Sequence, residues 1–209
     1  MTFQAVIFDM DGLLVDSERI WYEVEDEMIT DRGHVYTAEV RESVVGTRLD
    51  EFIPYLRNHY GFKESVEELI DELTNRLLVR IAKDVDAQPG AVEMIDYVRQ
   101  SGIPHAIASS SPMSVINATL EAQGWGDLFP VRCTADDEPR GKPAPDVYLA
   151  AARRLQVDPT ACLALEDSPN GSRAAVAAGM TCYAVPDLSH SSISDFDGIT
   201  PHVFASLHD

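Results

Sequence analysis

The hydrophobic pattern along the chain predicts a sheet whose first strand is followed by a long helical insertion. Residues 3–8 form a short apolar run with β-branched members, typical of a strand buried on both faces of a parallel sheet. From about residue 18 to residue 83, apolar residues instead recur at helical spacing, and no convincing strand interrupts them. We therefore expect about four helices here, followed by the loop Gln88-Pro89-Gly90.

After this loop, helical and strand-like segments alternate regularly. The expected helices cover residues 91–100, 114–123, 146–155 and 170–178, and the expected strands cover residues 104–109, 131–134, 162–165 and 181–185. Strands that alternate with helices need crossover connections, so the pattern predicts a doubly wound, parallel α/β sheet. We predict a Rossmann-like core of residues 1–16 and 89–209, with an all-helical cap of residues 17–88 inserted after the first strand.

Composition narrows the possible partners. The chain has 209 residues, of which 45% are hydrophobic, as in an ordinary globular protein. Its 16 Lys and Arg face 35 Asp and Glu, which gives a net charge of −19. Binding to nucleic acid requires many basic contacts to phosphates, and binding to an anionic membrane requires a polybasic stretch. We therefore expect neither a nucleic acid nor a membrane as partner.

The cysteines and the N-terminus bear on the compartment. The chain has three cysteines, Cys133, Cys162 and Cys182, without a CxxC pair, which favours buried thiols in a reducing environment. The N-terminal residues have neither the basic start nor the apolar run of a signal peptide. No apolar stretch approaches the about 20 residues that span a bilayer. We expect a soluble, cytoplasmic protein that is a monomer or a weak homodimer.

Polar side chains follow three of the predicted strands. Asp9 and Asp11 follow the first strand, Ser109–Ser111 follow the second, and Glu166-Asp167-Ser168 follows the strand at residues 162–165. The carboxyl ends of parallel strands meet at one edge of the sheet, where ligands bind in such folds. Clustered carboxylates repel one another unless a cation lies among them, and Mg²⁺ prefers such oxygen ligands. This pattern predicts a Mg²⁺ site.

Lys142 is the lysine most interesting for function. The chain has only two others, Lys63 and Lys83, and both lie in the helical insertion. Lys142 stands in Arg140-Gly141-Lys142-Pro143-Ala144-Pro145-Asp146, where glycine and two prolines stiffen the loop. We interpret Lys142 as a functional cation. The alternative is a solvated surface lysine.

Four ordered motifs resemble those of the haloacid dehalogenase superfamily. They are Asp9-Met10-Asp11-Gly12-Leu13-Leu14-Val15-Asp16-Ser17-Glu18, Ser109 after a strand, Gly141-Lys142-Pro143-Ala144-Pro145-Asp146, and Glu166-Asp167-Ser168-Pro169-Asn170-Gly171. The match extends over essentially the whole chain, with order and spacing intact. The helical insertion is similar to the cap of the β-phosphoglucomutase and sugar-phosphate phosphatase branch, which includes 2-deoxyglucose-6-phosphatase-like enzymes.

The resemblance implies a role for each acid. Asp9 would be the nucleophile that forms an aspartyl-phosphate. Asp11 would protonate the leaving oxygen and then act as base toward the hydrolytic water. Asp9, Asp167 and the main-chain carbonyl of Asp11 would hold Mg²⁺, with Glu166 bound directly or in the second shell.

The resemblance also implies which groups bind the phosphoryl oxygens. Ser109 and the neighbouring main-chain N–H, at Ser110, would donate hydrogen bonds to them, and Lys142 would pair with their charge and with Asp9. For Ser109, a helix N-cap is the rival interpretation. Asn170 would either cap a helix or steady the metal loop.

The residues of the predicted cap are less diagnostic. Residues 16–18 would be a hinge for cap closure, an N-cap with an acidic first turn, or both. Arg48 would reach a substrate anion or hydroxyl, and the alternative is a solvated arginine at a helix start. For Trp21 we favour a core aromatic over a side chain that lines the cleft.

The chemistry that this resemblance implies is Mg²⁺-dependent hydrolysis of a small phosphorylated metabolite, in particular a sugar phosphate. A cap over the site leaves little room for a phosphoprotein. A phosphomutase is the nearest alternative, but β-phosphoglucomutases carry a histidine where this chain has Trp21. A dehalogenase is disfavoured because Asp11 and Gly12 are retained. A phosphorylatable receiver module is disfavoured because its aspartate follows a later strand and no cap intervenes.

Overall fold

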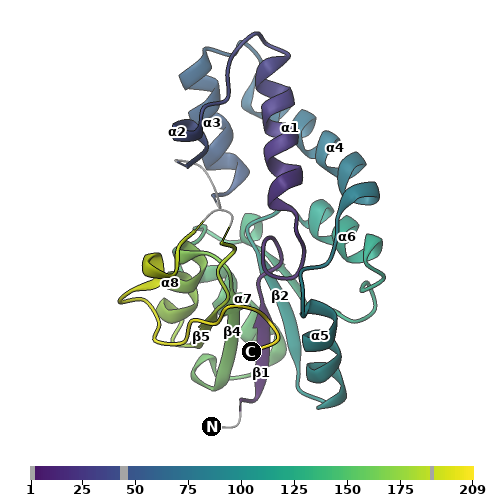
Figure 1. Ribbon diagram of the computed structural model, residues 1–209, viewed down its shortest axis with the longest axis vertical. Coiled ribbons are helices and arrows are strands. Elements are labelled where there is room, and N and C mark those ends of the chain that lie inside the picture. Colours follow the sequence, from purple (N-terminus) through teal and green to yellow (C-terminus); the bar gives the residue numbers. More distant parts are fainter. Residues whose placement is uncertain (1–2, 43–46, 189–190) are drawn as a thin grey trace.

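The computed structural model describes residues 3–42, 47–188 and 191–209, without the side chain of Glu42. Within these residues, five strands form one sheet in the order β3-β2-β1-β4-β5 (Figure 1). The strands are β1 (Ala5–Phe8), β2 (His105–Ser109), β3 (Arg132–Thr134), β4 (Cys162–Glu166) and β5 (Thr181–Ala184). Every pairing between them is parallel, so the predicted doubly wound sheet is confirmed.

Helices cover both faces of the sheet. Val6 and Phe8 of β1 pack on one face with α5 (Ala91–Gln100) and α6 (Met113–Ala122). Ala5 and Ile7 point to the other face, where α7 (Asp146–Leu155) and α8 (Pro169–Ala177) lie. This second face is rich in alanine, which lets the helices approach the strands closely. Alternate residues of one apolar strand are thus buried on opposite faces, as its sequence predicted.

Among the described residues between β1 and α5, four helices form the insertion. They lie above the sheet in Figure 1. They are α1 (Glu18–Thr30), α2 (Ala38–Glu42), α3 (Leu49–Tyr60) and α4 (Val66–Asp84). The helical insertion is confirmed, whereas the boundaries at residues 17 and 88 stay a prediction. Helix α4 packs against α6 of the core, and one apolar cluster runs from the insertion to the α5 and α6 face. This shared core fixes the insertion above one edge of the sheet.

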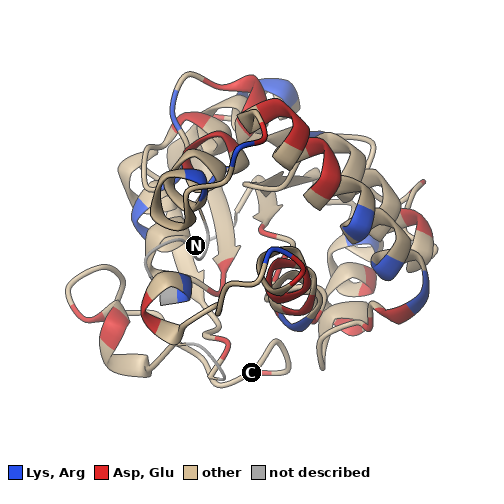
Figure 2. Ribbon diagram, turned by 90° about the horizontal axis from the view of Figure 1, so that it is seen from above, with Lys and Arg blue, Asp and Glu red and all other residues tan. Residues whose placement is uncertain are grey.

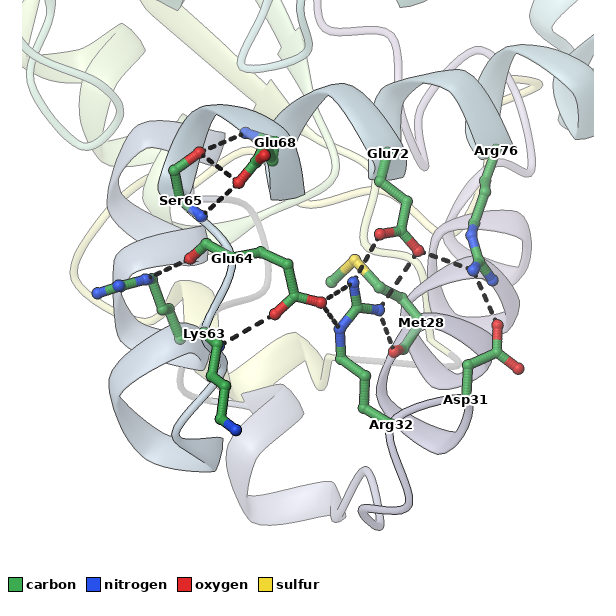
Figure 3. A network of polar contacts seen from close by, with 10 residues as sticks. Met28, Asp31, Arg32, Lys63, Glu64, Ser65, Glu68, Glu72 and Arg76 are labelled. Carbon is green, nitrogen blue, oxygen red and sulfur yellow. Dashed lines mark hydrogen bonds and ion pairs between the residues drawn. The ribbon is translucent and has the colours of Figure 1, made fainter.

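A charged network ties the outer part of the insertion together (Figure 3). Arg32, just after α1, pairs with Glu64 at 2.9 Å and with Glu72 of α4 at 2.6 Å. Arg76 of α4 joins Glu72 to Asp31 at 2.7 and 2.8 Å. These side chains are partly exposed, so each pair contributes about 0–1 kcal/mol. Their main effect is to fix α1 against α4, and α1 carries part of the site described below.

Charged residues are distributed over the whole molecule. Figure 2 shows acidic positions on the helices of both the insertion and the core, interspersed with fewer basic positions. In the ranges that the structure describes, no helix is long and apolar enough to cross a membrane.

Candidate active site

The polar residues predicted to converge do so at the carboxyl edge of the sheet. Strand β1 lies between β2 and β4, so the residues that follow these three strands are neighbours. The main-chain N–H of Asp9 donates to the carbonyl of Leu165 at 3.0 Å, which continues the pairing of β1 with β4 beyond Phe8. A cavity of about 320 Å³ opens above this edge. Its core side is lined by Asp9, Asp11, Ser109, Ser110, Ser111, Lys142 and Asp167, among others.

Lys142 lies at the centre of the core side. Its Nζ donates to Oδ1 of Asp9 at 2.5 Å and to Oε1 of Glu166 at 2.6 Å. The Lys142 side chain is only 4% exposed, so the interpretation as a surface lysine is wrong. Burial lowers the pKa of Lys142, but the charges of Asp9 and Glu166 outweigh it and raise the pKa above its ordinary 10.5. The lysine therefore stays charged.

Glu166 is completely buried behind Lys142, and both of its oxygens accept hydrogen bonds. Oε1 accepts from the Tyr148 hydroxyl at 2.8 Å as well as from Lys142. Oε2 accepts from the main-chain N–H groups of Asp167 and Ser168, both at 3.1 Å. A Cβ on Gly171 would overlap the Glu166 carboxylate, which explains the glycine here. With its oxygens so occupied, Glu166 orients Lys142.

Tyr148 was missed by sequence reasoning. It is fully buried in α7, and Nζ of Lys142 lies 5.1 Å from the centre of its ring. Burial raises the pKa of the Tyr148 hydroxyl well above 10.0, so this hydroxyl stays a donor to Glu166. The sequence signal was weak: a single tyrosine on the apolar face of an alanine-rich helix.

Asp11 is held by hydrogen-bond donors from both the core and α1. Oδ2 accepts from Ser109 at 3.1 Å and from Ser111 at 2.8 Å. Oδ1 accepts from the Ser17 hydroxyl at 2.7 Å and from Nε1 of Trp21 at 3.4 Å. The carboxyl group of Asp11 thus makes hydrogen bonds both to the core site and to the start of the insertion.

These contacts decide several open interpretations. Ser109 is not an N-cap, because α6 begins after Pro112. Ser17 occupies the N-cap position of α1, but its side chain makes no capping hydrogen bond and reaches Asp11 instead. Trp21 lines the cavity and its ring also packs against the apolar core, so both interpretations of Trp21 hold in part. For α8 the N-cap is Ser168, and Asn170 lines the cavity.

The carboxylates form a pocket suited to a hard cation. Oxygens of Asp9, Glu166 and Asp167 lie within 4.8 Å of one another. Burial, together with the neighbouring acids, raises the pKa values of Asp9 and Asp167 well above 3.8, against the opposing charge of Lys142. No hydrogen-bond donor among the described residues reaches Oδ2 of Asp9 or the Asp167 carboxylate. Three clustered carboxyl groups outnumber the single positive charge of Lys142, and carboxylate oxygens are the ligands that Mg²⁺ prefers.

Two further details fit a ligand above the acids. Gly12 has φ +82°, and a Cβ there would overlap the Asp167 carboxylate, so the Asp11-Gly12 turn lies against that acid. The Ser110 hydroxyl is buried and has no hydrogen-bond partner in the described part of the chain. Because a buried hydroxyl without a partner is costly, Ser110 is suited to donate to a ligand oxygen.

Arg48 lies at the contact between insertion and core, not among the described residues that line the cavity. Its guanidinium pairs with Asp50 and donates to the main-chain carbonyl of Glu138 at 2.8 Å. A Cβ on Gly141 would lie 2.6 Å from the Arg48 side chain. The Arg48 side chain is 11% exposed, so the interpretation as a solvated helix-start residue is wrong.

The far side of the cavity comes from the insertion and was largely missed by sequence reasoning. We define this cap wall as Glu18, Trp21, Tyr22, Glu25, Arg41 and Phe52. Glu25 is 9% exposed and accepts from the Tyr36 hydroxyl at 2.8 Å. Burial raises the pKa of Glu18 to about 7 and that of Glu25 to about 8. The signal available in the sequence was that Glu25, an acid, stands next to Val24 on the apolar side of α1.

The raised pKa of Glu25 predicts a pH-dependent loss of stability. We expect the free energy of unfolding of the unmodified chain to fall, relative to Glu25→Gln, as the pH rises. The pKa of Glu25 rises from 4.5 to about 8 on folding, so the folded state holds a proton that the unfolded state releases. The stability linked to this proton is complete below pH 4.5 and is lost as the pH rises through about 8.

Urea unfolding at about pH 5.5 and about pH 8 measures this difference. Glu27→Gln, an exposed position on the same helix, is the control and should follow the unmodified chain. The same pH dependence in Glu25→Gln and the unmodified chain would contradict the assignment.

Fold and site together define an α/β enzyme with a helical insertion over a buried acidic cluster that could hold a metal ion. The sequence model for haloacid dehalogenase-like hydrolases matches residues 3–179. The putative phosphatase YhcW of Bacillus subtilis is 40% identical over 186 residues, covering 88% of this chain and 84% of that protein. Hexitol phosphatase B of Escherichia coli is 33% identical over 185 residues, covering 87% and 83%. The chain belongs to the haloacid dehalogenase-like hydrolase family, as its motifs predicted.

A solved structure extends the likeness to the whole fold. A mutant of CbbY from Rhodobacter sphaeroides, crystallised in complex with xylulose-(1,5)bisphosphate, superposes with a TM-score of 0.89 and 26% identity. The match covers 100% of this chain and 96% of that one. The predicted architecture, a doubly wound core with a helical cap, is thus shared with a protein that binds a phosphorylated sugar.

Proposed function

We propose that this chain is a Mg²⁺-dependent phosphatase that hydrolyses a small phosphorylated metabolite, in particular a sugar phosphate, through an aspartyl-phosphate. The observation that carries the proposal is the environment of Asp9. This carboxylate lines the cavity, 2.5 Å from the Lys142 ammonium, and the Ser110 hydroxyl, which has no partner among the described residues, belongs to a residue that lines the same cavity. A nucleophile, a fixed cation and an unused donor therefore face the same small space.

Asp9 and Asp167, with the main-chain carbonyl of Asp11, are the groups that would hold Mg²⁺. When bound, the ion supplies positive charge that offsets the phosphoryl oxygens and the clustered carboxylates. Glu166 is the less suitable ligand, because both of its oxygens already accept hydrogen bonds. Lys142 would hold Asp9 ionised and oriented, and Ser110 would donate to a phosphoryl oxygen.

In the first step, a carboxylate oxygen of Asp9 attacks phosphorus and the bond from phosphorus to the ester oxygen breaks. Asp11 delivers its proton to that leaving oxygen. In the second step, Asp11 takes a proton from water, the water oxygen attacks phosphorus, and the bond to Asp9 breaks. The products are the free alcohol and inorganic phosphate. Ser17, Ser109 and Ser111 hold the Asp11 carboxyl in place for both transfers.

The size of the substrate follows from the cavity. A volume of about 320 Å³ is at the lower end of ligand pockets, which run from about 300 to 1,000 Å³. The cap wall lies on the side of the cavity opposite the acids, so a phosphorylated side chain of a folded protein would have to pass it to reach Asp9. Sugar phosphates are favoured by the relatives, one named a hexitol phosphatase and one crystallised with a sugar bisphosphate.

A phosphomutase is the alternative activity, and Trp21 argues against it. The Trp21 indole N–H lies 3.4 Å from Asp11 and is a donor only. An imidazole at this position can exchange a proton with the acid, whereas an indole cannot.

A screen of phosphorylated sugars, polyols and other small metabolites with Mg²⁺ tests the proposal. Inorganic phosphate and isomerised product are measured in the same reactions. We expect phosphate release at a catalytic rate and no isomerised product. Isomerisation without phosphate release would support the mutase, and no turnover of any ester would contradict both activities.

Removal of the metal provides an independent prediction. We expect EDTA to reduce phosphate release by at least about 100-fold, because several kcal/mol of charge stabilisation in the transition state is lost. Excess Mg²⁺ should restore the rate, and calcium, which tolerates looser coordination, should restore it poorly. Full activity in EDTA after dialysis would contradict a metal-dependent reaction.

A further inference from the structure

The cap wall carries a chemistry that the proposed reaction does not use. Its face toward the cavity presents two acids, Glu18 and Glu25, and one guanidinium, Arg41, among the described lining residues of the insertion. Aromatic rings, Trp21 and Phe52, complete it. Trp21 reaches Asp11 of the core site at 3.4 Å, whereas no hydrogen bond joins Glu25 to a described residue of the core.

The balance of charge on this wall does not suit a second phosphate. Arg41 lies over the ring of Tyr22, 4.5 Å from the ring centre. Burial raises the pKa values of both Glu18 and Glu25, and the charge of Arg41 offsets this only in part. One guanidinium thus faces two carboxyl groups. A further anion brought here would compete with these carboxyl groups for the same guanidinium.

Arg48 is the cap residue that the sequence analysis expected to reach a substrate anion or hydroxyl, but it makes contacts outside the cavity. Its guanidinium pairs with Asp50 and with the main-chain carbonyl of Glu138. Releasing it toward the cavity would break an ion pair and leave that carbonyl without this donor.

Glu25 has the features of a residue that hydrogen-bonds a substrate hydroxyl. Its Oε2 accepts from the Tyr36 hydroxyl at 2.8 Å, which fixes the carboxyl group in one orientation. Oε1 has no hydrogen-bond donor in the described ranges of the chain, although Glu25 is nine-tenths buried and lines the cavity. A buried carboxyl group with one unpartnered oxygen is satisfied by an incoming hydroxyl, which accepts from the protonated acid and donates to the carboxylate.

We propose that Glu25, oriented by Tyr36, determines specificity by hydrogen bonding to a hydroxyl on the remote end of the substrate. The chain then selects monophosphates with an uncharged, hydroxylated tail over bisphosphates with a second phosphate at that end. The rings of Trp21 and Phe52 contact the C–H faces of this tail. This inference rests on the proposed phosphatase activity and names its substrate class.

Three esters test it: a polyol monophosphate, an alkyl monophosphate of equal length, and a polyol bisphosphate with the second phosphate at the far end. The measured quantity is the ratio of kcat/KM values between esters. The unmodified chain should prefer the polyol monophosphate over both others. In Glu25→Met, the preference for polyol over alkyl should fall about 10- to 100-fold, the effect of a lost hydrogen bond to a charged or buried group.

Glu25→Gln and Glu27→Gln make the result interpretable. Glutamine keeps an oxygen that accepts from a hydroxyl, so Glu25→Gln should keep the polyol preference within about threefold. Glu27→Gln is exposed on the same helix and should behave as the unmodified chain. If Glu25→Met does not fold, the ratio in Tyr36→Phe, which frees the Glu25 carboxyl to rotate, should also fall.

Two outcomes would overturn the inference while phosphatase activity stands. One is an equal loss on the polyol and alkyl esters in Glu25→Met, which indicates a structural role. The other is a preference of the unmodified chain for the bisphosphate. If the unmodified chain releases phosphate from none of the three esters nor from p-nitrophenyl phosphate, the proposed function fails and this inference fails with it.

Discussion

Asp9→Asn is expected to lower kcat/KM for phosphate release by at least about 100-fold, because the amide cannot attack phosphorus and the covalent route is lost. The side chain would keep its shape, and its amide oxygen would still accept from Lys142. The fold should therefore persist. Removing one of several clustered acids should even leave stability unchanged or slightly raised, since burial raises the pKa of Asp9 well above its ordinary value.

Steady-state phosphate release and thermal unfolding of the same preparations test both halves of this prediction. Asp71→Asn, an exposed aspartate on α4, is the matched control and should retain full activity. Residual activity above about a hundredth in a folded Asp9→Asn variant would mean that another group attacks phosphorus. A variant that loses activity only because it unfolds would be recognised by its thermal transition.

Much of the core could be predicted from periodicity alone. The helices expected at residues 91–100 and 146–155 are α5 and α7 with the same bounds. Their apolar faces repeat at 3.6 residues and are bounded by glycine, proline or a polar residue, so pattern and structure agree. The strands were predicted within two residues at each end, because buried parallel strands are short apolar runs.

The core side of the site was predictable for the same reason. Once β1, β2 and β4 are parallel neighbours, the residues that follow them must meet, and Asp9, Ser109 and Asp167 do so. Lys142 required more, because it lies on a loop and its position depends on Glu166 and Tyr148. The useful signal was that Lys142 is the only lysine of the sequence outside the helical insertion.

The cap side could not be predicted in this way. Periodicity shows which face of α1 is apolar, but not that α1 leans over the core so that Trp21 reaches Asp11. It also does not show that Arg48 faces the Glu138 carbonyl, 90 residues away in sequence. Glu25 was hidden because an acid on an apolar helix face looks like an interruption of the pattern. These positions depend on long-range packing between the insertion and the core.

Lys142→Met is expected to remove activity and stability together. The variant should lose at least about 100-fold in kcat/KM, because the charge beside Asp9 and the phosphoryl group is gone. In EDTA, the free energy of unfolding at neutral pH should fall by about 3–5 kcal/mol, the usual effect of removing one partner from a buried ion pair. Lys142 has two such partners, Asp9 and Glu166, and all three side chains are at most 8% exposed.

The stability loss in Lys142→Met should depend on pH in a defined direction. Without the ammonium group, burial and the neighbouring acids raise the pKa values of Asp9 and Asp167 further above 3.8. A carboxyl group whose pKa rises on folding contributes stability that is present below its unfolded pKa and is lost as the pH rises through the folded value. The deficit of the variant should therefore grow between about pH 5 and about pH 8.

Urea unfolding in EDTA at these two pH values, and again with excess Mg²⁺, separates the causes. Because the cation replaces part of the missing charge, Mg²⁺ should recover more stability in the variant than in the unmodified chain. Lys83→Met, an exposed lysine of α4, is the matched control and should change little. If Lys142→Met unfolds at the same urea concentration as the control at neutral pH, the acids are not held by Lys142, and the positive charge that permits Asp9 to stay ionised must come from the metal alone.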